Sequence, residues 1–122
     1  MTQAKLRSVK HSEVSEDRVF FDLAHFEATT MHDLTLQVEI LMLFNQQLDS
    51  VAKKLEAGEL AGPDRKFLGH TLRGSAAAVG AIEIEALAQV WEAAASDQSS
   101  LLKKLNFAIT RFREATAHYI SP

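Results

Sequence analysis

Apolar residues recur at three- and four-residue steps between Asp33 and Ala57, which predicts a long amphipathic helix. Leucines at every seventh position and other large apolar residues between them form one stripe: Leu34, Leu41, Leu48 and Leu55, with Val38, Phe44 and Val51. The stretch Gly58–Pro63 interrupts this pattern. Gly58 can form a left-handed helix cap and Pro63 suits the first turn of a new helix, so a second helix is expected to begin there.

Three further segments have helical periodicity. A helix from about Pro63 to Val79 is expected to turn one face into the core, made by Leu68, Leu72, Ser75, Val79 and Ile82. After a bend at Gly80-Ala81, the pattern resumes to about Ala95. A polar loop over residues 96–100 then precedes a last helix, whose inner side holds Leu101, Leu105, Ala108, Ile109, Phe112 and Tyr119. Large aromatic residues are also expected in the core: Trp91, Phe44, Phe67, Phe107 and Phe112.

These segments predict an all-α fold. Four helices joined by loops of about two to six residues must run antiparallel to their neighbours, because such loops cannot cross the length of a bundle. The expected architecture is an up-down-up-down four-helix bundle, with a short helix before it at about residues 21–28. Residues 1–18 are expected to be a polar leader with too few apolar side chains to order it, and residues 19–122 to form the domain.

Composition excludes several kinds of protein. The 122 residues include no cysteine, which rules out disulfides, thiolate metal sites and cysteine nucleophiles. The 13 basic and 16 acidic residues are interspersed, with a net charge of -3, so no nucleic-acid-binding surface is indicated. The N-terminus lacks the apolar run of a signal peptide, and no later segment has the ~18 apolar residues that span a bilayer. A soluble, cytoplasmic protein without membrane contact is therefore expected.

The segment from Gly69 to Ala81, with the sequence GHTLRGSAAAVGA, is the most informative for function. At 100° per residue, a set of side chains falls within about 60° of His70 on one helix face: Lys66, Arg73, Gly74 and Ala77. The larger apolar residues occupy the opposite face, so His70 is expected to be exposed. A glycine inside a helix makes the helix less stable by about 0.5–1 kcal/mol than an alanine would. This predicted helix nevertheless contains both Gly69 and Gly74.

The residues around His70 suit chemistry on an anion. Gly74 lowers the surface one turn after the histidine, which lets another protein approach the imidazole; close helix packing is the alternative reason for a glycine there. Arg73 and Lys66 could stabilise a phosphoryl group, or could be ordinary solvated charges. A neutral imidazole nitrogen is also a competent nucleophile near pH 7.

The run from His70 to Ala81 resembles the signature of the histidine-containing phosphotransfer (HPt) domain family, in which a histidine precedes a cation, glycine, serine and further small residues. The resemblance implies a four-helix bundle that accepts a phosphoryl group from the aspartyl phosphate of a receiver domain, or passes it to one. The receivers would belong to response regulators or hybrid histidine kinases of two-component signalling. Family members have no ATP site, and the Mg²⁺ of the reaction belongs to the receiver.

The resemblance also assigns roles to single residues. His70 would be the phosphoacceptor, Gly74 the clearance for the receiver, and Ser75 the small packing residue beside it; Ala77 lies on the same docking face. The family's lysine is replaced by Arg73, which is planar and bulkier. A Gln or Glu on the next helix is expected to hydrogen-bond the other imidazole nitrogen. Glu92 matches by spacing, with Gln89 as its competitor.

Two alternatives to a phosphotransfer protein follow from the same residues. A bundle of this kind could bind or sequester a receiver without being phosphorylated, although a pure binder has no need of the histidine. A carboxylate-bridged metal protein shares the architecture, but no two of the other histidines are spaced as metal ligands: His11, His25, His32 and His118. We expect a monomeric carrier without a metal or cofactor of its own, and not a small-molecule enzyme.

Overall fold

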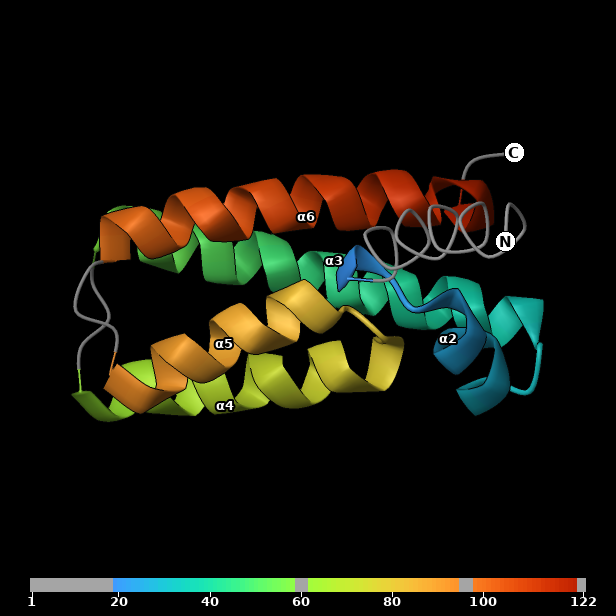
Figure 1. The fold of residues 1–122 in the computed structure, drawn as a ribbon, viewed down its shortest axis with the longest axis horizontal. Helices are drawn as coiled ribbons and strands as arrows, with labels where there is room; N and C mark the ends of the chain where they lie inside the picture. The colour runs from blue at the N-terminus through green and yellow to red at the C-terminus, as the bar shows by residue number, and fades with distance from the viewer. Residues whose placement is uncertain (1–18, 59–61, 95–97, 121–122) are drawn as a thin grey trace, which may run out of the picture.

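The computed structural model describes residues 19–58, 62–94 and 98–120, and every regular element within these ranges is an α-helix (Figure 1). The five helices are α2 (Leu23–Thr29), α3 (Leu34–Ala57), α4 (Gly62–Val79), α5 (Ile82–Ala94) and α6 (Gln98–Ile120). The all-α prediction is therefore confirmed for this part of the chain. The predicted leader, residues 1–18, lies outside the described residues.

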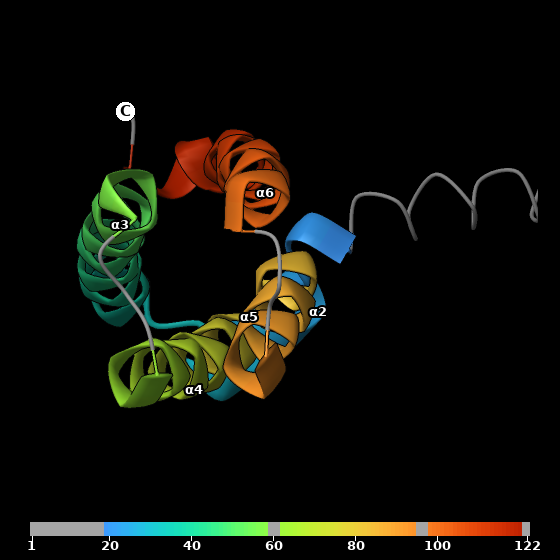
Figure 2. The same ribbon diagram turned by 90° about the vertical axis from the view of Figure 1, so that its left-hand side faces the viewer.

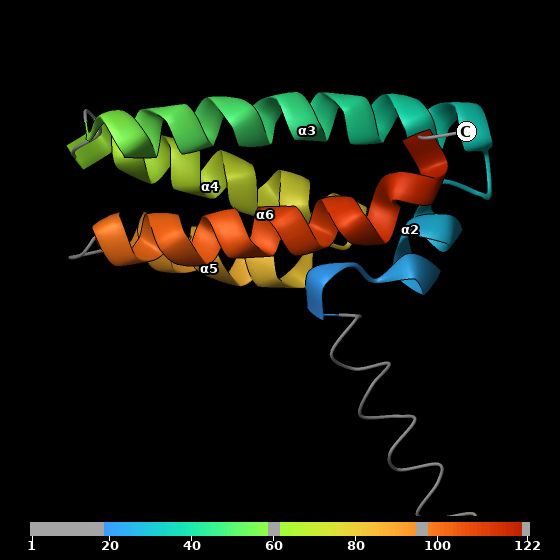
Figure 3. The same cartoon turned by 90° about the horizontal axis from the view of Figure 1, so that it is seen from above.

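Four of the helices surround a common core. α3 contacts α4 and α6, and α5 contacts the same two helices, so each of the four has two neighbours. A view along the long axis shows the four helices around a shared centre (Figure 2). Buried apolar side chains from these helices make up the core. The shorter α2 packs on α4 at one end of the molecule (Figure 3).

The core is built from the predicted apolar stripes. Most of the predicted positions on α3 and α6 are buried: Leu41, Phe44, Leu48, Val51 and Leu55 on α3, and Leu101, Leu105, Ala108, Ile109 and Phe112 on α6. Trp91 of α5 is the largest fully buried side chain. Burying one large apolar side chain stabilises a fold by roughly 1.5–3 kcal/mol, so this set is the main favourable contribution to folding.

Local caps define where the helices begin and end. The Asp33 side chain accepts a hydrogen bond of 3.2 Å from the Leu36 N–H and so starts α3. Gly58 ends α3 in the left-handed conformation that its position predicted, with φ at 67°. Gly80, with φ at 80°, makes the turn from α4 to α5. Its carbonyl accepts a 2.8 Å hydrogen bond from the Asp22 N–H, which ties the segment before α2 to this turn.

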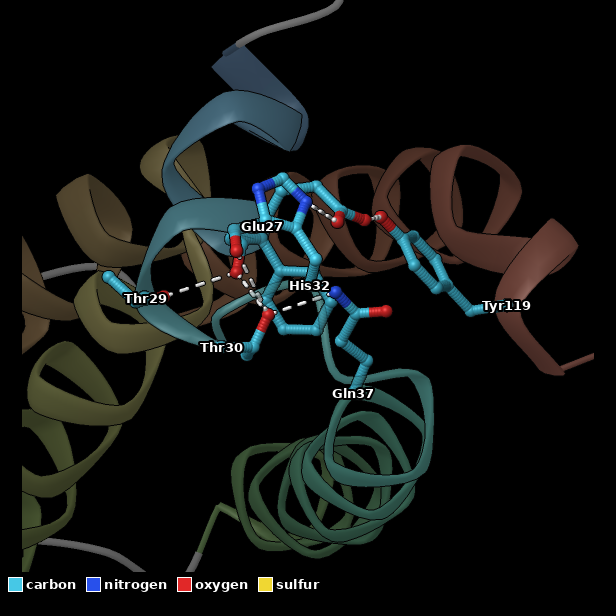
Figure 4. A network of polar contacts seen from close by, with 7 residues as sticks. Glu27, Thr29, Thr30, His32, Gln37 and Tyr119 are labelled. Atoms are coloured by element: carbon cyan, nitrogen blue, oxygen red, sulfur yellow. Dashed lines mark hydrogen bonds and ion pairs between the residues drawn. The ribbon is translucent and has the colours of Figure 1, made fainter.

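A polar network joins α2 to α3 and α6 (Figure 4). The Tyr119 hydroxyl donates to Glu27 Oε2, and His32 Nδ1 lies 2.8 Å from Glu27 Oε1. Nearby, the buried Gln37 amide donates a 2.9 Å hydrogen bond to the Thr30 hydroxyl. The bond from Tyr119 is the main cause that lowers the pKa of Glu27, while burial and the same bond raise the pKa of Tyr119. The network therefore holds a carboxylate and a neutral phenol together at this end of the molecule.

Two residues at helix ends are exposed, although their periodicity predicted burial. Leu34 lies in the first turn of α3, which is about 36 Å long against about 27 Å for α4, and so extends beyond the α4–α5 turn (Figure 1). Ile82 was assigned to the inner face of α4, but the chain reverses at Gly80 and the periodicity of α4 ends there. Ala81, which precedes Ile82 in this turn, is buried instead.

Two aromatic predictions were also wrong, since Phe67 and Phe107 are exposed. Phe67 precedes His70 by three residues, so the two share a helix face and both point outward. Phe107 packs at the surface, edge-on against Phe20 with 5.8 Å between the ring centroids. The predicted loop over residues 96–100 is also shorter than expected, because α6 already begins at Gln98.

Candidate functional site

His70 lies in the middle of α4 and its side chain is 65% exposed. Its Nδ1 atom is 3.0 Å from Oε2 of Glu92 on α5, whose side chain is only 17% exposed. An ionised carboxylate only accepts hydrogen bonds, so the proton of a neutral imidazole must lie on Nδ1 to make this bond. The lone pair is therefore on Nε2.

The Nε2 atom of His70 is free to react. Among the described residues, none makes a hydrogen bond to it. A neutral imidazole nitrogen with an accessible lone pair is a nucleophile, and it can also act as a proton acceptor. Within the described ranges, no three His, Asp or Glu side chains come together as a metal site, so the imidazole is not part of a ligand cluster there.

Arg73 lies on the Nδ1 side of the imidazole. Its Nε atom is 3.2 Å from Glu92 Oε1, and its Nη2 atom is 3.2 Å from His70 Nδ1. The first contact is an ion pair without hydrogen-bond geometry, since Oε1 accepts no hydrogen bond from the described residues. When the imidazole carries its proton on Nδ1, as the contact with Glu92 requires, the second contact joins two donors and is not a hydrogen bond. From the sequence, Arg73 could stabilise a phosphoryl group or be an ordinary solvated charge; in the structure its charge is paired with Glu92.

Lys66 and Gln89 border a shallow pocket beside this ion pair. The pocket has a volume of about 420 Å³ and is lined by Arg65, Lys66, Arg73, Gln89, Glu92 and Ala93. Of the two side chains that competed for the imidazole, Glu92 makes the contact and Gln89 does not. Lys66 is exposed and has no hydrogen bond or ion pair within the described part of the chain. It is therefore a cation one turn before His70 that has no partner among the described residues.

Two residues that bring Glu92 to His70 were not assigned a role from the sequence. Gly69 is buried, and a Cβ atom placed on it would lie 2.9 Å from the Glu92 backbone, so α4 and α5 are in direct contact there. Arg65 donates to the carbonyl oxygens of Trp91 and Glu92. The glycine inside a helix was a visible signal at Gly69, but an arginine in a first helical turn is too common to single out Arg65.

The three small residues expected at a docking face lie around His70 in different ways. Gly74 is exposed, and a Cβ atom placed on it would meet nothing within 4 Å, which excludes close helix packing as the reason for this glycine. Ala77 is exposed one turn further on, and its carbonyl accepts a 3.1 Å hydrogen bond from His25 Nε2 of α2. Ser75 is half-buried on the side facing α3, and its hydroxyl donates to the Thr71 carbonyl.

An apolar groove lies between α3 and α4, next to Ser75. It has a volume of about 240 Å³ and is lined by Ile40, Leu43, Phe44, Gln47, Ser75, Ala78 and Val79. Leu43 is exposed at the groove and Phe67 is exposed on the His70 face of α4. We call Leu43, Phe67 and Ala78 the apolar patch. Leu43 and Ala78 line the groove between α3 and α4, and Phe67 shares the His70 face of α4.

Comparison of this chain with protein-family models, with curated proteins and with solved structures found no match. In the residues that the structure describes, no helix is both long enough and apolar enough to span a membrane. The conclusions about function therefore rest on the geometry of the site and on the motif that surrounds His70.

Proposed function

We propose that this protein is a histidine phosphotransfer domain, which carries a phosphoryl group on His70 between receiver domains of two-component signalling. The observation that carries the proposal is the hydrogen bond from His70 Nδ1 to Glu92, because it leaves the Nε2 lone pair in solvent. The motif that follows His70 supports the same function. The domain supplies a nucleophile and a docking surface, and has no role for ATP.

In the transfer step, each bond that forms is matched by a bond that breaks. The Nε2 lone pair attacks the phosphorus of a receiver's aspartyl phosphate, a P–N bond forms, and the P–O bond to the aspartate carboxylate breaks. The imidazole ring keeps its proton on Nδ1 and so becomes positively charged. The Glu92 carboxylate accepts a hydrogen bond from this N–H group. Its negative charge offsets the positive charge of the ring, as carboxylates do for other reactive imidazoles. The reverse step returns the phosphoryl group to a receiver.

The cations around His70 divide between two tasks in this proposal. Arg73 pairs with Glu92 and keeps the carboxylate facing the imidazole. Lys66, which has no ion pair in the described residues, is available to the phosphoryl oxygens one turn away. The Mg²⁺ of the reaction is assigned to the receiver, as the resemblance implies, and this chain is assigned no cofactor.

The surface around His70 suits a receiver domain. Gly74 and Ala77 add little to the surface beside the imidazole, since neither residue has a side chain larger than a methyl group. Of the apolar patch, Phe67 lies on the His70 face of α4, and Leu43 and Ala78 line the groove between α3 and α4. A partly apolar surface of moderate size is typical of transient signalling contacts. We therefore assign the docking surface to α4 together with the adjoining part of α3.

We also propose how the four long helices run relative to one another. The connections between the four long helices comprise residues 58–61, 80–81 and 95–97, and connections this short favour an antiparallel up-down-up-down bundle. A monomer fits a carrier that must present one face to successive partners. A cytoplasmic location fits the receivers with which it would exchange phosphate.

The test is phosphoryl transfer from a panel of phosphorylated receiver domains with Mg²⁺ to wild type, His70→Ala and His25→Ala. His25 is the matched control, because it is also exposed and lies close to the same face. We expect acid-labile phosphate on wild type and His25→Ala, and none on a folded His70→Ala protein. Label that persists in His70→Ala, or no label from any receiver while binding is detected, would refute phosphotransfer at His70.

A further inference from the structure

Glu92 lies in the last turn of α5, where helices are least firmly held. The last four carbonyl groups of an α-helix have no partner within the helix, and this part of a helix frays unless other groups satisfy them. α5 ends at Ala94, so the carbonyls of Trp91 and Glu92 are among these four. The carboxylate that orients His70 is therefore carried by a segment that needs support from outside α5.

Arg65 supplies that support from α4. Its Nη1 atom donates to the Trp91 carbonyl and, at 3.3 Å, to the Glu92 carbonyl. The guanidinium thus satisfies two carbonyls at the end of α5, and its positive charge lies at the negative end of the helix dipole. Arg65 makes no hydrogen bond or ion pair with the imidazole itself, so we expect its effect on His70 to pass through Glu92.

Gly69 sets the separation of the two helices at the same point. A Cβ atom on Gly69 would lie 2.9 Å from both Cα and N of Glu92, and 3.0 Å from its Cβ. The Cα and N atoms belong to the backbone of Glu92 and cannot move aside without shifting α5. His70 is the next residue along α4, so the helix contact at Gly69 brings the Glu92 carboxylate within 3.0 Å of Nδ1.

We propose that Arg65 and Gly69 are positioning residues, which hold Glu92 against His70 and thereby select the Nδ1–H tautomer with its reactive Nε2. Gly69 fixes the distance between α4 and α5, and Arg65 holds the last turn of α5 in place. The tautomer is a property of the free protein and needs no partner. Only the consequence for transfer rate rests on the proposed function.

The test is ¹⁵N NMR of histidine-labelled protein at about pH 8, where an ordinary imidazole is neutral and the two ring nitrogens report the tautomer. We expect the Nδ1–H form of His70 to predominate in wild type. In Arg65→Met and in Gly69→Ala, the population should move towards the Nε2–H form. Arg65→Lys, which keeps a donor and the charge, should recover part of the wild-type signal.

Arg113→Met is the matched control, because Arg113 also bridges two helices, donating to Asn45 and Asp49 of α3 from α6. It should lower thermal stability and leave the His70 tautomer unchanged. An unchanged tautomer in folded Arg65→Met, or the same tautomer shift in Arg113→Met, would overturn the proposal. If the tautomer shifts as expected but wild type accepts no phosphate, the positioning role stands and the proposed function fails. If wild type accepts phosphate, Arg65→Met should transfer about 10-fold more slowly or worse.

Discussion

His70 and Glu92 belong to different helices and meet through a 3.0 Å contact between Nδ1 and Oε2. The imidazole is mostly exposed and the carboxylate mostly covered, so the pair has one side fixed in the protein and one side open to a partner. This arrangement suits a nucleophile that Glu92 orients on the Nδ1 side and that a partner approaches from the solvent side.

Removing the carboxylate should slow transfer without unfolding the protein. We expect Glu92→Ala to reduce the rate by about 10- to 100-fold, as is usual when a partner that orients a histidine is lost. Glu92→Gln should fall between this variant and wild type, because an amide oxygen can still accept from Nδ1 but carries no charge. The rates are measured with one phosphorylated receiver. Glu85→Ala, on the same helix, serves as the control, and a wild-type rate for Glu92→Ala would contradict the role of the carboxylate.

Substitutions at Gly74 should affect the stability of the protein and the docking of a receiver in different ways. Since a Cβ atom there meets nothing within 4 Å, Gly74→Ala should stabilise the protein by about 0.5–1 kcal/mol in urea unfolding. Gly74→Gln should remain folded but accept phosphate more slowly from a receiver, because its side chain stands in the approach to His70. Its reaction with a small phosphoryl donor such as phosphoramidate should keep the wild-type rate. Equal receiver rates for Gly74→Gln and wild type would refute the clearance.

The exposed phenylalanines allow a matched test of the apolar patch. Phe67 is 68% exposed beside His70, and Phe107 is 58% exposed on α6. If Phe67 contributes as a typical central interface residue, Phe67→Ser should raise the Kd for a receiver by about fivefold or more. Phe107→Ser should leave that Kd unchanged. Equal effects of the two substitutions in a titration would show that the receiver does not dock on this patch.

The pair of Glu27 and Tyr119 predicts how stability depends on pH. Because the pKa of Glu27 is lowered from 4.5, its ionised form stabilises the fold above that pH, and this contribution is lost as the pH falls through the lowered pKa. The pKa of Tyr119 is raised from 10.0, so its neutral form stabilises the fold below pH 10.0, and this contribution is lost as the pH rises through the raised pKa.

Tyr119→Phe tests that dependence, because it removes the hydroxyl and keeps a ring to pack edge-on against Phe21 and Phe26. We expect it to lose less stability than wild type between neutral and acidic pH in urea unfolding. The variant should also lose less stability than wild type between neutral and strongly alkaline pH. Parallel pH profiles for the two proteins would show that the hydrogen bond to Glu27 does not contribute.

The helical fold and the exposure of His70 were predictable because both depend on periodicity. The heptad leucines Leu41, Leu48 and Leu55 mark the buried side of α3, and Gly58 marks its end. The same 100° geometry places His70 opposite Leu72 and Val79, and these two are buried as expected. The same geometry places Phe67 on the exposed face with His70, since the two are three residues apart.

The contacts between helices were not predictable in the same way. Glu92 and Gln89 lie one turn apart on α5, and their spacing alone does not decide which of them meets His70. The contact of Gly69 with the Glu92 backbone decides it, and that contact depends on how α4 and α5 pack. The position of Arg73 is decided by the same carboxylate, because the ion pair draws the guanidinium to the Nδ1 side.

The most direct test of the central claim is to find which atom carries the phosphoryl group. Protein labelled with ¹⁵N at histidine is phosphorylated with phosphoramidate, and the coupling of ³¹P to the ring nitrogens is measured by NMR. We predict a single phosphohistidine, at His70, with phosphorus on Nε2 and the proton still on Nδ1. Phosphorus on Nδ1, phosphorylation of another histidine in its place, or a folded protein that takes up no phosphate would contradict the account.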